Sequence, residues 1–304
     1  MHVVVTGGTG FVGSELVRQL LARGDRVTVL TRGQNAGAPG ATAQTWNPLE
    51  AGPWMKAIDG ADAIVHLAGK NLFDSRWSDA HLAECLASRV RPTELLVEAI
   101  EAARAKPKVF VSCSAVGIYG MKRGAEVVDE TSPPGSPAGD PLVQICLAWE
   151  AAAAPARAAV RLAIPRMGIV LGKGEGVLGK LEAPFRAFVG GPLGNGEQYV
   201  PWIHVRDAAR ALLHAIDTES VQGTFNVCAP TAVTMNQLTA AMGKVLGRPS
   251  VFRVPAPILK LVLGRAAEAV LTGQRAVPRV LESAGFTFAF PDLEAALHDI
   301  LDGK

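Results

Sequence analysis

The feature that most constrains the fold is a glycine-rich segment at residues 6–13, with the sequence TGGTGFVG. It follows the apolar run Val3–Val5, typical of a buried strand, and precedes apolar residues at helical spacing up to Leu21. Glycines in such a turn let the backbone approach a diphosphate, while the free N–H groups and dipole of the helix favour the anion. The segment therefore predicts a dinucleotide site. Its predicted contact residues are Gly7, Thr9, Gly10, Phe11, Val12 and Gly13.

The remaining pattern predicts an α/β fold of the Rossmann type, with a doubly wound parallel sheet. Short apolar runs alternate with helical periodicity through the first two-thirds of the chain, which indicates strands joined by crossover helices. We assign residues 1–170 to this dinucleotide-binding domain, with a strand at about 224–227 as a candidate to rejoin its sheet. Residues 171–304 are predicted to form a smaller substrate-binding and C-terminal region packed on it.

Three local predictions concern less regular segments. A helix is expected from about Asp79 to Ala105, with a kink or a new first turn at Pro92. The segment 117–141 is rich in Gly, Pro, Ser and charged residues, which predicts a surface loop long enough to cover a site. Alternating aromatic residues at Phe286–Phe290 predict a strand, and Asp292 is expected to begin the last helix.

Composition limits the partners and the compartment. The net charge is +2 with acidic and basic residues interspersed, so nucleic acid and membranes are not expected partners and a small-molecule substrate is. Four scattered cysteines without metal-ligand spacing are expected to be reduced core thiols, with no metal site. Because Val3–Val5 already forms a strand, no leader is expected, and we predict a cytoplasmic protein. A homodimer is left open.

The end of the second strand indicates which dinucleotide is bound. An acidic residue about twenty positions after the glycines would bind the ribose 2′-hydroxyl of NAD. This chain has Thr31 and Arg32 there instead. A guanidinium suits a 2′-phosphate, so NADP(H) is favoured over NAD(H).

Several segments together resemble one superfamily. Besides the glycine loop, these are HLAG at 66–69, SCSAVGIYG at 112–120, RLAIPRMGIVLG at 161–172 and PWIHVRD at 201–207. The chain resembles the extended or atypical short-chain dehydrogenase/reductases, within the NAD-dependent epimerase/dehydratase family. It is most similar to the epimerase-family proteins of unassigned substrate that end in a short C-terminal domain. Hydride-transfer or epimerase chemistry is the activity that this resemblance implies.

The resemblance also implies roles for particular residues. Ser114 would face the nicotinamide and the substrate carbonyl, whereas His66 is interpreted as a buried strand residue. The implied adenosine and pyrophosphate contacts are Trp46, Asn47, Leu67, Ala68 and Gly69. The implied substrate-pocket residues are Lys70, Arg89, Arg166, Trp202 and His204, and an anionic substrate would suit the arginines among them.

One expected feature is missing. Short-chain dehydrogenases usually transfer a proton through a tyrosine four residues before a lysine, whose ammonium lowers the pKa of the phenol. The chain has two tyrosines, and neither is followed by lysine at that spacing. Alignment through Trp149-Glu150 puts Leu142 at the tyrosine position and Cys146 at the lysine position.

Three hypotheses follow from this loss. The chain is an NADP-dependent oxidoreductase or epimerase whose proton donor has moved, with Tyr119 as the candidate and Lys122 or Arg123 as its charge partner. Alternatively, it binds NADP(H) without turnover, as a sensor or regulatory protein on a retired enzyme scaffold. In the third hypothesis, the chain is a binding or assembly protein whose fold is mainly stabilised by the dinucleotide. No sequence feature specifically supports this hypothesis.

Overall fold

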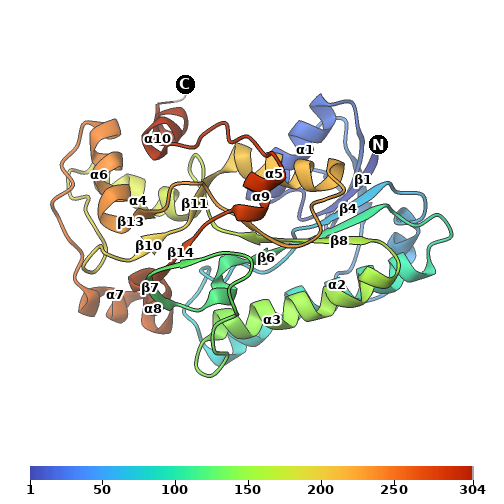
Figure 1. Cartoon of the computed structure of the whole chain (residues 1–304), viewed down its shortest axis with the longest axis horizontal. Helices are drawn as coiled ribbons and strands as arrows, with labels where there is room; N and C mark the ends of the chain where they lie inside the picture. Colours follow the sequence, from blue (N-terminus) through green and yellow to red (C-terminus); the bar gives the residue numbers. More distant parts are fainter. Residues whose placement is uncertain (303–304) are drawn as a thin grey trace.

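A computed structural model describes residues 1–302, and its centre is a parallel sheet (Figure 1). The strand order is β12-β8-β5-β4-β1-β2-β3, and the short β6 also pairs with β8. Every pairing in this sheet is parallel, which confirms the predicted doubly wound Rossmann-type fold. The strands are β1 (His2–Thr6), β2 (Arg26–Thr31), β3 (Thr42–Thr45), β4 (Ala63–His66), β5 (Val109–Ser112), β6 (Ser114–Ala115), β8 (Arg161–Met167) and β12 (Gly223–Val227).

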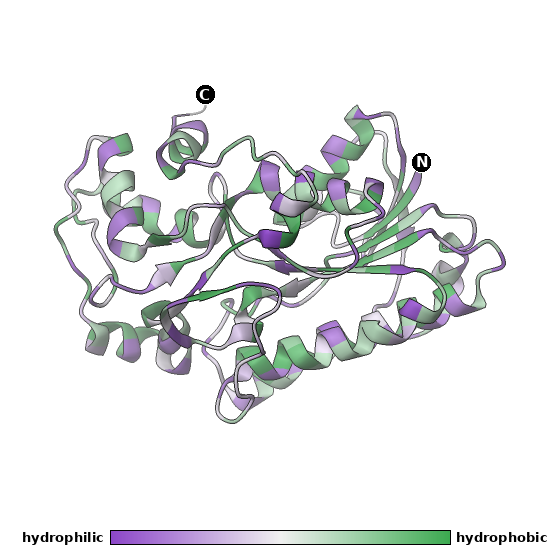
Figure 2. Ribbon diagram, viewed as in Figure 1, coloured by the Kyte–Doolittle hydropathy of each residue, from purple (hydrophilic) through white to green (hydrophobic). Residues whose placement is uncertain are grey.

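Both faces of the sheet are covered by helices because successive strand residues point to opposite sides. In β1, Val3 and Val5 face a core shared with α1 (Phe11–Ala22) and α5 (Val205–Asp217). Val4 faces the opposite core, which includes side chains of α2 (Asp79–Ala102) and α3 (Pro141–Ala153). Figure 1 shows α1 and α5 above the sheet and α2 and α3 below it, and apolar residues are prominent along the strands in Figure 2.

Elements beyond residue 170 also belong to these layers. Strand β12 pairs with β8 and extends the sheet by one strand, from Gly223 opposite Ala163 to Val227 opposite Met167. Helix α5 packs beside α1, because its small and branched residues such as Ala208 and Leu212 share the core of α1. The C-terminal part of the chain therefore contributes to the dinucleotide-binding fold as well as to a separate layer.

That separate layer lies beside the sheet and has its own core. It contains buried side chains such as Phe185, Trp202 and Leu238. Its helices are α4 (Gly176–Arg186), α6 (Met235–Leu246) and α10 (Leu293–Leu301). Helices α7 (Ala256–Leu263) and α8 (Ala267–Leu271) contribute to a small cluster around Trp77 and Met121. Helix α9 (Arg279–Ser283) packs on β12, and its Leu281 belongs to the core of α1 and α5. Small strand pairs connect it, namely β9 (Ile169–Leu171) with β11 (Trp202–His204), and β10 (Tyr199–Val200) with β13 (Val233–Thr234). Within residues 1–302, no helix has the length and apolarity needed to cross a membrane.

The structure corrects the prediction of a surface loop at 117–141. Residues Val116–Tyr119 form a buried 3₁₀ turn, and β7 (Lys122–Val128) pairs with β14 (Gly273–Ala276). The partner strand is about 150 residues away in sequence, so local composition does not reveal the pairing. The rest of the segment, up to the start of α3, has no regular structure.

The expected strand at Phe286–Phe290 is also wrong. The segment has no regular structure, and its aromatic residues instead pack over α5 and its start, with Phe286 near His214 and Phe290 stacked on His204. The backbone N–H of Phe290 donates to the buried carboxylate of Asp207 at 2.8 Å. The aromatic residues at every second position of this segment therefore reflect contacts with α5 and its start, and not the alternation of a strand.

Two further expectations concern α2 and the cysteines. Helix α2 runs through Pro92 without a new start, and Thr93 Oγ1 donates to the carbonyl of Arg89 at 2.6 Å beside the proline. The expectation of reduced core thiols is confirmed, since Cys85, Cys113, Cys146 and Cys228 are buried and unpaired by disulfides.

Candidate functional site

The glycine loop forms a close-packed turn between β1 and α1. Gly7 has a left-handed φ of +68°, and a Cβ on it would lie 2.9 Å from the backbone N of Ala68. A Cβ on Gly13 would lie 2.0 Å from the carbonyl oxygen of Gly7. Both positions therefore exclude a side chain. The loop is held against the chain that follows β4 and against its own helix.

The start of α1 presents backbone donors. Gly10 is the N-cap and supplies no side-chain cap, and the first backbone N–H of the helix with an acceptor is that of Ser14, which donates to the Gly10 carbonyl at 2.8 Å. Within residues 1–302, the N–H groups of Phe11 and Val12 therefore have no acceptor. Free donors at a helix N-terminus suit a phosphate. The residues present fit the diphosphate of a dinucleotide.

Beside the loop, the ends of β2 and β3 lie together. Trp46 N donates to the Thr31 carbonyl at 3.0 Å, which brings the predicted adenosine residues next to the 2′-phosphate residues. Arg32 is exposed, and its guanidinium has no partner among the described residues. Trp46 itself is a core residue, 5% exposed, with its ring edge-on to Trp54, whereas Asn47 is exposed.

A buried threonine and histidine shape the loop after β4. Thr6 Oγ1 accepts from the N–H groups of Leu67 and Ala68, both at 3.2 Å, so it donates its own proton to His66 Nδ1 at 2.7 Å. Complete burial, with the nearby Arg89 charge, lowers the pKa of His66 to about 3, so this ring is neutral. The interpretation of His66 as a buried strand residue agrees with this geometry.

At the other end of the site, polar side chains from β6, α3 and β8 bond to one another. Ser114 Oγ donates to Glu150 Oε1 at 2.7 Å. Arg166 makes a fork-like pair with the same carboxylate, Nε at 2.9 Å and Nη2 at 3.0 Å. Burial opposes the charge of Arg166, but the hydrogen bonds and charge of Glu150 prevail and raise its pKa. Ser114 is 1% exposed, so its hydroxyl is committed to Glu150.

Tyr119 belongs to the same network. Its hydroxyl donates to Asn226 Oδ1 at 2.8 Å and accepts from Arg166 Nη1 at 3.1 Å. Burial raises the pKa of this phenol, against the opposing effect of Arg166. The charge partner of the hydroxyl is therefore Arg166, which corrects the expectation of Lys122 or Arg123. The side chain is fully buried, so its hydroxyl is enclosed by protein.

The positions of the missing tyrosine and lysine lie on the same face of α3 as this network. Leu142 packs on Gly117, where a Cβ would lie 3.2 Å from its own. Cys146 is buried, and burial raises the pKa of its thiol to about 12. Cys113, after β5, has a pKa raised to about 12 for the same reason. Neither Leu142 nor these thiols can exchange a proton near neutral pH.

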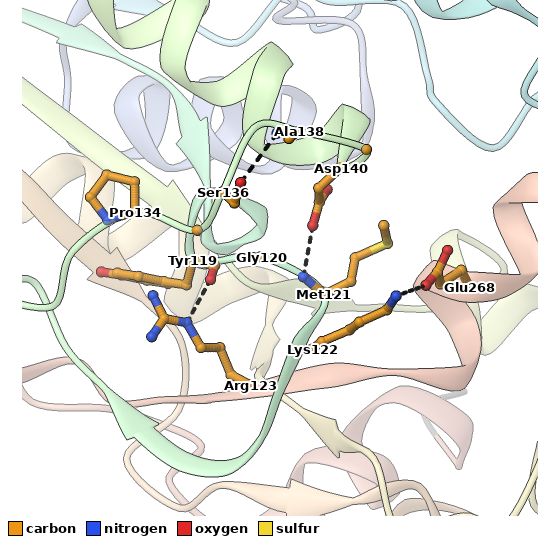
Figure 3. Close-up of a pocket in the computed structure, with 12 residues that line it drawn as sticks. Tyr119, Gly120, Met121, Lys122, Arg123, Pro134, Ser136, Ala138, Asp140 and Glu268 are labelled. Carbon is orange, nitrogen blue, oxygen red and sulfur yellow. Dashed lines mark hydrogen bonds and ion pairs between the residues drawn. The ribbon is translucent and has the colours of Figure 1, made fainter.

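A hollow of about 430 Å³ lies beside the network, between the loop at 134–140 and β7 (Figure 3). Its charged side chains Lys122 and Arg123 bond to neighbouring protein groups. Lys122 pairs with Glu268 at 2.8 Å, and Arg123 Nε donates to the Tyr119 carbonyl at 2.8 Å. The Tyr119 ring contributes to the wall, but its hydroxyl is bonded elsewhere, so the hollow contains no unpaired acid or base from this set.

The predicted substrate-pocket residues do not all gather at one place. Trp202 is buried in the C-terminal layer and donates from Nε1 to the Thr231 carbonyl at 3.1 Å. His204 caps α5 and pairs with Asp299 at 3.2 Å, and burial lowers its pKa. Lys70 forms an ion pair with Glu84 on the surface.

Arg89 is the cation that stays beside the cofactor loop. A Cβ on Gly69 would lie 3.1 Å from its guanidinium carbon. Because Lys70 and Arg166 are already paired with carboxylates, the case for an anionic substrate now depends on Arg89.

Sequence reasoning missed Glu150 and Asn226 as members of the site. Glu150 carries a signal, since it follows Cys146 by four residues and thus shares its face of α3. Asn226 is a fully buried polar residue inside an apolar strand. Because buried polar side chains almost always have a hydrogen-bond partner, its position indicates a polar contact in the core.

Comparisons with known proteins agree with this architecture. Residues 3–228 match the NAD dependent epimerase/dehydratase family, and residues 254–300 match a domain of unknown function, DUF1731. Epimerase family protein SDR39U1 from Bos taurus is 39% identical over 305 residues, which cover 99% of this chain and 100% of that protein.

Two solved structures are also similar over nearly the whole chain. The crystal structure of human epimerase family protein SDR39U1 (isoform 2) with NADPH has a TM-score of 0.91 and 36% identity, covering 100% of both chains. The nucleoside-diphosphate sugar epimerase from Corynebacterium glutamicum has a TM-score of 0.80 and 32% identity, covering 99% of this chain and 58% of that one. The protein therefore belongs to the NAD-dependent epimerase/dehydratase family, as its sequence motifs predicted.

Proposed function

We propose that this protein binds NADP(H) and transfers hydride between it and a small-molecule substrate, as an oxidoreductase or epimerase. The observation that carries the proposal is the glycine turn, which leaves the N–H groups of Phe11 and Val12 free at the start of α1. The similarity to a human protein crystallised with NADPH supports the same cofactor here.

The preference for the phosphorylated cofactor rests on Arg32. Its guanidinium is exposed and unpaired in the described chain, at the end of β2 beside Thr31. A 2′-phosphate offers two negative charges and several acceptors to such a fork. No carboxylate stands at this position to bind the 2′-hydroxyl of NAD.

Bound NADPH would supply the hydride, and the protein must hold it and exclude competing chemistry. The described side chains offer few proton donors for the other half of the reaction. The hydroxyls of Tyr119 and Ser114 already donate to protein side chains, and the Cys146 thiol keeps its proton at neutral pH. We infer that the proton comes from solvent or from the substrate itself. Acceptors whose reduced form is a weak base, such as quinones, suit this site better than simple ketones.

The test has two parts. NADPH is first titrated into the protein while its fluorescence is recorded, which measures binding. Oxidation is then followed by absorbance with a panel of aldehydes, ketones and quinones. Binding with oxidation by one class supports the proposal. Tight binding without oxidation across the panel would favour the sensor hypothesis, and absence of binding would overturn both.

A further inference from the structure

Helix α2 brings a cation to the place where α3 lacks one. Arg89 lies in the middle of α2, and its guanidinium carbon is 5.1 Å from the centre of the Trp149 ring. Trp149 follows Cys146 by three residues and so lies one turn further along the same face of α3. On its other side, the guanidinium touches Gly69, in the loop that follows β4. Arg89 therefore fills the space between that loop and the lysine position.

The hydrogen bonds of Arg89 use one of its three nitrogen atoms. Nη1 donates to the carbonyl of Lys70 at 2.8 Å and to that of Cys85 at 3.0 Å. Within residues 1–302, Nε and Nη2 have no oxygen acceptor, although the Cys85 thiol lies close to the guanidinium, and neither nitrogen is fully shielded from solvent. They are therefore available to a bound ligand.

Arg89 also has no anionic partner in the described chain. Burial lowers its pKa, and the neighbouring thiols of Cys85, Cys146 and Cys113 stay neutral because burial raises their pKa values, to about 12 for Cys146 and Cys113. An arginine remains protonated in such a setting. A half-buried cation without a counter-charge is costly unless another group completes its hydrogen bonds.

We propose that Arg89 supplies the cation that the missing lysine would have placed beside the nicotinamide half of the dinucleotide, with Nε and Nη2 donating to the ribose on that side. The inference rests on the proposed NADP(H) site. Arg89 reaches this region from α2, which explains how Cys146 can occupy the lysine position without leaving the cofactor cleft uncharged.

A purely structural role makes a different prediction. If Arg89 only tied α2 to the loop at residues 69–70, its loss would disturb the loop and weaken every ligand that touches it. If it holds the nicotinamide half, the loss should depend on whether the ligand contains that half. NADPH and 2′,5′-ADP provide the comparison, since 2′,5′-ADP keeps the adenosine and the 2′-phosphate but has no nicotinamide ribose.

The experiment measures the affinity of both ligands by calorimetry for the wild type, Arg89→Gln and Arg89→Lys. The control is Arg91→Gln, which removes a partly exposed arginine two residues along α2 that pairs with Glu94 and Glu98. We expect Arg89→Gln to weaken NADPH about tenfold and to change 2′,5′-ADP less than twofold, because a charged donor is lost from one half of the site. Arg89→Lys should recover part of the NADPH affinity, and Arg91→Gln should change neither.

Two results would overturn the inference while leaving the proposed function intact. One is an equal loss of affinity for both ligands in Arg89→Gln and Arg89→Lys, which indicates loop support. The other is unchanged NADPH affinity in a folded Arg89→Gln protein. If the wild type binds neither ligand, the proposed NADP(H) site fails, and this inference fails with it.

Discussion

The two ends of the candidate site are built by different means. At the β1–α1 end, Gly7 and Gly13 remove side chains, and the groups presented to a ligand are backbone N–H donors. At the β5–α3 end, the polar groups are side chains, and Ser114, Glu150 and Arg166 satisfy one another. The first region leaves donors open for a ligand, whereas the polar groups of the second already satisfy one another. Under the proposed function, binding of the dinucleotide and proton transfer to the substrate would therefore depend on different parts of the site.

The largest expected loss of stability comes from breaking the Arg166–Glu150 pair at the β5–α3 end of the site. Arg166→Met would leave the carboxylate of Glu150 buried without its cation, since the two side chains are 7% and 14% exposed. Breaking one side of a buried pair costs about 3–5 kcal/mol of the free energy of unfolding. Urea denaturation measures this cost. The double variant Arg166→Met with Glu150→Leu should recover part of it, and equal losses for single and double variants would contradict the coupling.

A smaller but specific effect is expected at the glycine end. In Gly13→Ala the new Cβ would lie 2.0 Å from the Gly7 carbonyl oxygen, so α1 must shift away from the turn. Overpacking of this kind costs about 3 kcal/mol, and NADPH binding should weaken with it. Thermal denaturation gives the stability. Gly33→Ala is the control, because a Cβ there meets nothing within 4 Å, and equal melting temperatures for the two variants would refute the packing argument.

The comparison also predicts which cofactor loses affinity when Arg32 is substituted. Arg32→Asp should weaken NADPH by roughly ten- to a hundredfold, because a charged hydrogen bond contributes about 1.5–3 kcal/mol, while NADH affinity should hold. Calorimetry with both cofactors gives the ratio. Arg104→Asp, an exposed charge reversal in the loop before β5, controls for net charge. An equal loss for NADPH and NADH would remove Arg32 from 2′-phosphate recognition.

Between the two ends, His66 predicts a pH dependence of stability. Its pKa is about 3 in the folded protein, below the ordinary value near 6.5 that it takes when unfolded. As pH falls below 6.5, the unfolded chain binds a proton that the folded chain refuses, so stability is full above this value and decreases below it. The loss is about 2 kcal/mol between pH 8 and pH 5. In His66→Gln this part of the slope should vanish, and parallel pH curves for the two proteins would contradict the assignment.

The contrast between the two ends also explains what could be predicted from the sequence. The glycine turn is local: its strand, its glycines and its helix lie within about twenty residues, and steric rules connect them directly. The order of apolar runs likewise predicts the parallel sheet. The pairing of β7 with β14 could not be found this way, because it joins segments about 150 residues apart with little apolar pattern.

The polar network was harder to predict for the same reason. The resemblance implies a pocket role for Arg166, but its partner Glu150 lies on another element. Asn226, which accepts from the Tyr119 hydroxyl, lies on a third. Hydrogen-bond partners of buried groups depend on tertiary placement, which residue type alone does not specify. Tyr119 was therefore predicted to be a proton donor from its motif, while its geometry shows a hydroxyl enclosed by Arg166 and Asn226.

The smallest expected effect tests that difference directly. Tyr119→Phe removes one hydrogen bond to Asn226 and one from Arg166, which should cost about 1–2 kcal/mol of stability and leave NADPH affinity unchanged. With any substrate that the panel identifies, turnover should also be unchanged. A general acid in the reaction would instead cost about 10²- to 10⁴-fold in rate. Tyr199→Phe, at the chain's other tyrosine, is the matched control, and a large rate loss confined to Tyr119→Phe would restore that residue as the donor because the enclosed hydroxyl would then have to open during catalysis.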